Sequence, residues 1–319
     1  MFRALVHGLL AYLLHSSRSA SGLICLAVLI FAPAESRAWG IVGHRIVCEL
    51  AYDLLKPEAR DEVDTLVASF VKPNGKKFNQ FSDSCHFADT ARHNARDGKR
   101  KWQSYARFDH WHYVNVPRDT QKFVVSALRC ERDCVLYAID SHARIFADKS
   151  KAIADRAEAL ILLAHWVADI HQPMHVSFAD DRGGSKILLD PKWGLGRHLH
   201  AAWDAGIIKK HRGKQRLTEY IGEQRSRVLT EQEVWRAETN PIVWAAESYA
   251  IVTSPEAHYC RWREVTAAKG TTQRRCEQTT EKAVIDEAYV SRTAPILEKR
   301  LRQAAARLAN LLERKLGLN

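Results

Sequence analysis

The sequence lacks the features that would divide it into separate parts. It has no tract rich in Pro, Gly and Ser, no low-complexity segment, and no repeat at the roughly 20–50-residue periods of solenoid proteins. It has no Cys-x-x-Cys pair, which makes a structural zinc-thiolate site a weak interpretation. These absences favour one large folded domain.

The N-terminal segment differs from the rest of the chain. Arg3 and Arg18 precede an apolar run of about ten residues at 22–31, and a small-x-small site ends at Ala38. We therefore expect residues 1–38 to be a signal peptide, cleaved between Ala38 and Trp39, and the mature protein to be secreted or periplasmic. A retained membrane anchor is the alternative, but the run falls short of the roughly 20 residues that a spanning helix needs.

The remaining residues carry an excess of positive charge. The whole chain has 48 Lys and Arg against 37 Asp and Glu; residues 39–319 keep 45 and 36 of them. This balance favours a polyanionic partner. A basic surface that only keeps the protein in solution is equally compatible, because net charge bears on association and not on chemistry.

Six cysteines follow the predicted cleavage site. An even number in an exported chain indicates disulfides. The local pairings to expect first are Cys130 with Cys134 and Cys260 with Cys276, which leaves Cys48 with Cys85. Other connectivities remain open.

Helical patterns dominate the predicted domain. Apolar residues recur at helical spacing, for example at Val42, Ile46, Leu50 and Leu54, and Pro173 should stop or kink the helix before it. The sequence predicts helices over 42–56, 124–147, 152–171, 216–251 and 278–316, and one strand of a small hairpin over 186–190. We expect a mainly α single domain over 39–319.

Histidine and aspartate recur at spacings that suit a metal. His165 and Asp169 lie four residues apart on one face of a predicted helix, and His200 and Asp204 repeat that arrangement. His175 follows Pro173, where a chain break could turn it toward the same place. Taken alone, such a pair is more often a surface hydrogen bond. Imidazole and carboxylate without thiolate, however, are the ligands of catalytic zinc.

Five motifs resemble those of the S1/P1 nuclease family, in the family's order. They include the WGxxGH start, the ADxxR segment and the aromatic-His-aromatic segment, and then HxxxDxxQPxH and HxxWD. In this chain they are Trp39–His44, Ala88–Arg92, Trp111–Asn115, His165–His175 and His200–Asp204.

The resemblance implies a multi-helix phospholipase C/P1 nuclease-like fold that holds three zinc ions. The first ion would be held by Asp89, His112, His165 and Asp169. The second would be held by Trp39, His44 and the bridging Asp169, with Trp39 using its α-amine and its carbonyl oxygen. The third would be held by His175, His200 and Asp204. A free α-amine, with a pKa of about 7.7–8.0, loses its proton readily beside a dication.

The resemblance also implies the reaction and its partners. The protein would hydrolyse single-stranded DNA and RNA to 5′-phosphorylated products and act on 3′-nucleotides, as a monomer with no stable protein partner and no membrane contact in its mature form. Asp89 and Asp169 would be catalytic as metal ligands. Arg92 is a candidate for neutralising charge on the phosphoryl oxygens, or else a structural ion pair.

Substrate contacts would come from Tyr113, Asn115 and Lys186. Tyr113 could stack on a base, or be a buried structural tyrosine. Three positions depart from residues common in the family: Asn115 and His198 stand where Asp and Asn respectively are frequent, and Ser185 replaces Asn in a GGNK segment.

Two other functions fit part of the pattern. A zinc phospholipase C also begins with a ligating tryptophan, but the WGxxGH start, the HxxWD end and the basic charge favour the nuclease. A non-catalytic secreted protein with structural zinc is the second alternative, and it would not need so many His and Asp ligands.

Overall fold

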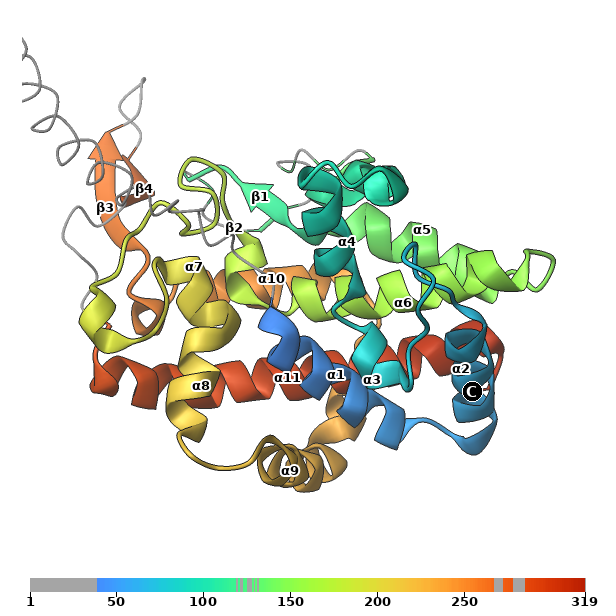
Figure 1. Ribbon diagram of the computed structural model, residues 1–319. Coiled ribbons are helices and arrows are strands. Elements are labelled where there is room, and N and C mark those ends of the chain that lie inside the picture. Colours follow the sequence, from blue (N-terminus) through green and yellow to red (C-terminus); the bar gives the residue numbers. More distant parts are fainter. Residues whose placement is uncertain are drawn as a thin grey trace, which may run out of the picture. The chain divides into compact units, whose positions relative to one another are not determined.

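Helices make up most of the computed structural model, which describes residues 39–118, 120, 123–124, 128, 130, 132–266, 272–277 and 285–318 (Figure 1). The described residues belong to one compact unit. The α-helices are α1 (Gly40–Leu54), α2 (Pro57–Ser69), α3 (Phe81–Ser84), α4 (Phe87–Arg96), α5 (Val135–Ala147), α6 (Ile153–Ile170), α7 (Leu199–Ala201), α8 (Ile207–Arg212), α9 (Leu217–Ala237), α10 (Pro241–Val252) and α11 (Glu287–Leu316). The mainly α fold class is confirmed.

Tighter or wider helical turns and two small sheets complete the described chain. The turns are η1 (Arg100–His112), η3 (Pro173–His175), η4 (Pro191–Trp193), the π-helical η5 (Ala202–Gly206) and η6 (Pro255–Ala257). The strands are β1 (Val114–Val116), β2 (Val176–Phe178), β3 (Arg261–Thr266) and β4 (Thr272–Glu277). β1 pairs with β2 in parallel, and β3 with β4 as an antiparallel hairpin. The sequence predicted neither pair.

Two of the predicted helices differ from those in the structure. The helix expected over 124–147 begins only at Val135, because Cys134 has extended backbone and the described residues before it are not helical. The helix expected over 216–251 is two helices, because the Asn240 side chain accepts a hydrogen bond from the Ile242 amide (3.0 Å) and Pro241 starts α10. The end at Pro173 is as predicted.

The remaining expectations are met in part. The strand expected over 186–190 is an isolated antiparallel bridge between Leu188 and His198. The last predicted helix is α11, which begins after the Asp286 cap; residues 278–284 lie outside the described part of the chain.

Helix α6 lies at the centre of the core. Its residues from Ala159 to Ile170 are all buried, as expected of a helix with apolar residues on every side. α5 packs along it, α1 packs along α11, and α11 also contacts α6 (Figure 1). The His and Asp residues on α6 therefore lie in the interior, where each polar atom needs a partner.

The C-terminal end of α6 is tied to two other helices. Arg300 of α11 donates to the backbone oxygen of His171 (3.1 Å) and to Glu247 of α10 (2.5 Å). Arg307 donates to the same carboxylate (2.6 Å). Because Asp169 lies just before this junction, these ion pairs fix the part of α6 that carries it.

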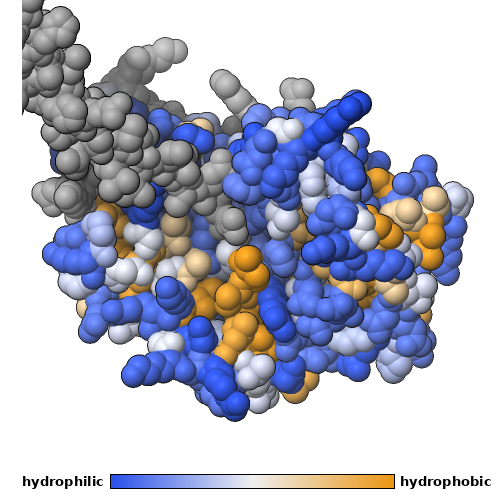
Figure 2. All heavy atoms as spheres, in the orientation of Figure 1, coloured by the Kyte–Doolittle hydropathy of each residue, from blue (hydrophilic) through white to orange (hydrophobic). Residues whose placement is uncertain are grey.

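The structure contains the disulfides Cys48–Cys85, Cys130–Cys134 and Cys260–Cys276, as the sequence predicts. Figure 2 shows that hydrophilic residues dominate the face seen there, with apolar residues gathered in a smaller area near its middle. Among the described helices, none is both long and apolar enough to cross a membrane.

Candidate metal centre

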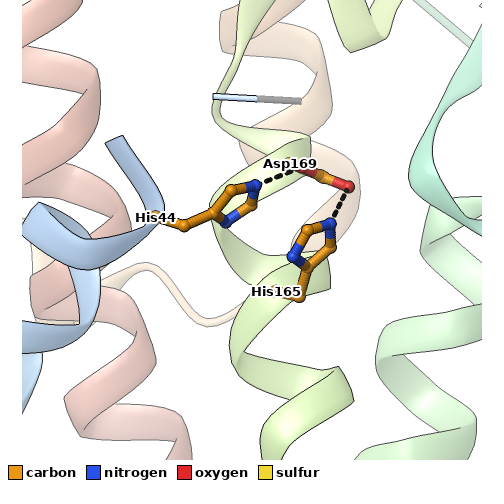
Figure 3. A group of neighbouring side chains, drawn as sticks. All are labelled: His44, His165 and Asp169. Carbon is orange, nitrogen blue, oxygen red and sulfur yellow. Dashed lines mark ion pairs between the residues drawn. The ribbon is translucent and has the colours of Figure 1, made fainter. Parts of the chain in front are cut away.

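Helices α1 and α6 bring His44 and His165 to the same carboxylate. Nε2 of His44 lies 3.4 Å from Oδ1 of Asp169, and Nε2 of His165 lies 3.2 Å from Oδ2 (Figure 3). His165 and Asp169 are one helical turn apart, so both point to one side of α6. The rings of His44 and His165 stack with centroids 3.9 Å apart.

A second group shares Asp169 and His165 with the first. Nδ1 of His112, at the end of η1, lies 3.0 Å from Oδ2 of Asp169 and 3.7 Å from Oδ1 of Asp89 on α4. Nε2 of His165 lies 4.0 Å from that same Asp89 oxygen. Asp169 thus lies between two sets of donors.

A third group forms where η3, α7 and η5 meet. Nε2 of His175 lies 3.8 Å from Oδ1 of Asp204, and Nε2 of His200 lies 3.6 Å from Oδ2. His198 accepts a hydrogen bond from the Ala201 amide (3.1 Å) and so caps α7. The π-helical turn that carries Asp204 is of a kind frequent at functional sites.

Backbone carbonyls orient three of these histidines. Nδ1 of His165 lies 2.7 Å from the carbonyl of Cys85, Nδ1 of His175 2.5 Å from that of His112, and Nδ1 of His200 2.7 Å from that of Gly183. A proton held on Nδ1 leaves Nε2 with its lone pair free toward the carboxylates. Metal-binding histidines are oriented in this way.

Several of the inward-facing atoms have no hydrogen-bond partner. They are Nε2 of His44, Oδ1 of Asp169 and Nε2 of His175. Buried polar atoms without partners are rare because each costs free energy of folding. Cations bound to the three groups would satisfy all three residues, so this donor set fits metal ions.

Burial keeps the histidines neutral, which is the state that binds a metal. It lowers the pKa of His44 and His165 to about 4 and that of His175 to about 3. Burial raises the pKa of Asp169 to about 6, although the neighbouring His44 partly opposes this shift. At neutral pH the centre therefore presents neutral imidazoles around an ionised carboxylate.

Trp39 is fully buried and lies beside this centre. Its indole nitrogen donates to the Ala168 carbonyl on α6 (2.6 Å), and its own carbonyl accepts from the Gly43 amide (3.0 Å). A Cβ at Gly43 would approach Trp39 Cβ to 2.9 Å, so glycine makes room for the tryptophan. In the 319-residue chain the Trp39 nitrogen is a peptide amide.

The other expected residues lie in different settings. Arg92 donates to Asp89 (2.8 Å) one turn earlier on α4, which is the structural ion pair weighed above. Tyr113 is partly buried, and Asn115 is in β1 opposite Ser177. Lys186 donates to the Asp180 carbonyl (2.8 Å) and belongs to none of the three donor groups.

Several residues that support the third group were not predicted from the sequence. Gln172 donates to Oδ1 of Asp204 (2.5 Å). Buried Arg118 binds Asp181 (2.6 Å), and Asp181 accepts from the Gly184 amide (2.9 Å), next to the Gly183 carbonyl that orients His200. Gln172 belongs to the HxxxDxxQPxH motif, so its place near the centre could have been predicted from the sequence. Arg118 is 62 and 63 residues from its partners Asp180 and Asp181, and no sequence pattern connects it with them.

Known proteins resemble this chain over nearly the whole domain predicted at 39–319. A family model described as S1/P1 Nuclease matches residues 39–317. Endonuclease 1 of Arabidopsis thaliana is 32% identical over 203 residues, which are 60% of this chain and 61% of that protein. Endonuclease 3 of the same plant is 26% identical over 308 residues (92% and 94%), and Nuclease P1 of Penicillium citrinum 25% over 186 residues (57% and 62%). The chain therefore matches less than two thirds of the length of Endonuclease 1.

Proposed function

The chain belongs to the S1/P1 nuclease family, and on that basis we propose that it is a zinc-dependent phosphodiesterase that hydrolyses single-stranded DNA and RNA to 5′-phosphorylated products. We propose that it also removes the phosphate of 3′-nucleotides. The proposal includes cleavage of residues 1–38 as a signal peptide, which would deliver a chain beginning at Trp39 to the periplasm or the medium.

The observation that carries the proposal is the convergence of eight His and Asp side chains in three groups. Asp89, His112, His165 and Asp169 would hold the first zinc ion, and His44, Asp169 and Trp39 the second. His175, His200 and Asp204 would hold the third. Zinc ions at such positions lower the pKa of water toward about 7 and offset negative charge on phosphate oxygens.

The chain's own residues then have distinct tasks. Asp169 and Asp89 supply the negative charge that keeps cations close together, and the carbonyls behind His165, His175 and His200 fix the rings before any substrate arrives. Arg92, which donates to Asp89, would also stabilise the negative charge that develops on a phosphoryl oxygen.

Base and sugar contacts are proposed at the rim. The half-buried ring of Tyr113 would stack on a base, a contact worth about 1–3 kcal/mol that tolerates any sequence. Asn115 and Lys186 would contact the nucleotide, which requires Lys186 to exchange the Asp180 carbonyl for a phosphate oxygen. Asn115 would act through its amide, since it lacks the carboxylate found in several relatives.

The test compares three substrates on the mature chain. Phosphate release from 3′-AMP and cleavage of single-stranded DNA should both occur, should stop with EDTA and should return with zinc. Headgroup release from phosphatidylcholine without nucleic-acid cleavage would instead support a zinc phospholipase C. If the zinc-loaded protein hydrolysed none of these substrates, the result would support a non-catalytic protein with structural zinc.

A further inference from the structure

We propose that the outer face of the β3–β4 hairpin is a docking surface for the phosphate backbone of a single-stranded polynucleotide. The proposal rests on the proposed function, and it adds a binding site for the strand beyond the phosphodiester at the metal centre.

The hairpin gathers arginines on one face. Its register places Arg261 opposite Glu277 and Arg263 opposite Arg275, and side chains two residues apart in a strand share a face. The three arginines are exposed. This outer face thus carries three positive charges and one negative charge.

The arrangement of these charges is unfavourable without an anion. Arg263 and Arg275 are a directly opposed pair of like charges, which destabilises a hairpin. Arg263 is partly balanced by Glu277 (2.7 Å), whereas Arg261 and Arg275 make no ion pair with any residue that the structure describes. Phosphates spaced along a strand would relieve the repulsion and release counterions.

The opposite face of the hairpin attaches it to the domain. The Trp262 indole donates to the Thr253 carbonyl (3.1 Å), the Arg274 guanidinium lies over the Trp262 ring (5.2 Å), and Cys276 is buried. The disulfide with Cys260 closes the base of the hairpin. The arginines of the outer face are therefore held facing away from the domain.

The base of the hairpin adjoins the third donor group. Arg118 lies 3.7 Å from Cys276 Sγ and binds Asp181, and Tyr259, just before the hairpin, donates to Asp181 as well (2.5 Å). Asp181 in turn holds the loop whose Gly183 carbonyl orients His200. A strand with one phosphate at His200 would continue past the hairpin, which lies on this side of the domain (Figure 1).

The test uses zinc-loaded mature protein with two substitutions, Arg261→Gln and Arg275→Gln. The matched control carries Lys149→Gln and Lys151→Gln. Both lysines are exposed between α5 and α6, so these substitutions remove the same amount of positive charge at a distant end of the domain (Figure 1). Each protein is assayed on single-stranded DNA and on a dinucleotide, at roughly 50 and 200 mM salt.

Loss of two phosphate contacts should reduce the slope of log K against log salt by about 1.4, so the rise in polymer KM over this salt range should be about sevenfold smaller than in the unsubstituted protein. Dinucleotide hydrolysis and the lysine control should be unchanged. Equal polymer KM and salt slope in the arginine and control variants would overturn the proposal, as would an equal loss on the dinucleotide.

Stopped-flow anisotropy with a fluorescent single-stranded oligonucleotide separates this proposal from the proposed function. Weaker binding by the arginine variant supports the hairpin surface even if the protein hydrolyses nothing, in which case only the proposed function fails. Unchanged binding contradicts the hairpin surface whether or not the protein is a nuclease.

Discussion

Nε2 of His44, on α1, lies 3.4 Å from Oδ1 of Asp169, on α6, and both atoms are buried without a hydrogen-bond partner. Such an arrangement lowers the free energy of unfolding unless a bound ion or molecule interacts with both atoms. The shared carboxylate of Asp169 also reaches His112 and His165 through its other oxygen. The proposed metal pair therefore depends on this one residue more than on any other.

Asp169→Asn should remove the two zinc ions of the pair and leave the third. An amide of the same shape has no charge to offset two dications, whereas the His175, His200 and Asp204 group is retained. Metal analysis should show zinc falling from three ions to one per chain, with activity lost by at least about a hundredfold. Unchanged zinc content in the Asn variant would contradict the bridging role.

Gln172→Leu should weaken the third ion without unfolding the protein. The substitution removes the hydrogen bond to Asp204 at nearly constant volume, and loss of such an outer partner costs about 10–100-fold in metal affinity or activity. Zinc release to a chelator should be faster for one ion of three. Gln224→Leu, a buried glutamine bonded instead to Arg302, is the control and should release zinc as the unsubstituted protein does.

Gly183→Ala should disturb His200 specifically. Gly183 has φ +66°, and a Cβ there would come within 2.6 Å of the Met174 carbonyl and 3.0 Å of His200 Nδ1. Gly317, with φ +75° and open space around it at the end of α11, also has a positive φ but lacks the clash. Both Ala variants should melt at lower temperature, but loss of one zinc ion is expected in Gly183→Ala alone; equal zinc content in both would contradict the assigned role of the loop.

Acidification should weaken zinc binding through Asp169 before it affects the histidines. The carboxyl has a pKa of about 6 in the metal-free protein because burial raises it, so a proton competes with metal below that pH. His44 and His165 are neutral down to about pH 4. In a chain that begins at Trp39, the α-amine adds a proton below about pH 8.

Zinc affinity measured by equilibrium dialysis should then fall at least about tenfold from pH 7 to pH 5. The same affinity at both pH values would mean that Asp169 is not a ligand. A fall that requires three or more protons would mean that the histidines are charged in this range.

The sequence predicted the parts of this centre that follow from spacing. His165 with Asp169, and His200 with Asp204, are each one helical turn apart, so a helix alone places them together. The sequence could not predict the carbonyls of Cys85, His112 and Gly183 that orient the rings, because every residue has a carbonyl and only the tertiary fold selects these. The role of Arg118 could not be predicted for the same reason, because its partners are distant in the chain.

The fold shows a similar division. Periodicity located α1 and α6 closely, because their apolar residues repeat over several turns. It failed where a local interaction overrides the pattern: at Asn240, whose side chain starts α10, and at Cys134, which is extended before α5. It missed the β3–β4 hairpin, whose charged side chains leave little apolar alternation.

The proposed metal centre is completed by the N-terminus of the mature chain, and zinc content per chain tests it most directly. Protein whose sequenced N-terminus is Trp39 should contain three zinc ions, and the same chain with one extra alanine before Trp39 should contain fewer, because an amide nitrogen cannot serve as the same donor. Three ions in both proteins would contradict the role of the Trp39 amine, and one ion or none in the chain that begins at Trp39 would contradict the metal centre itself.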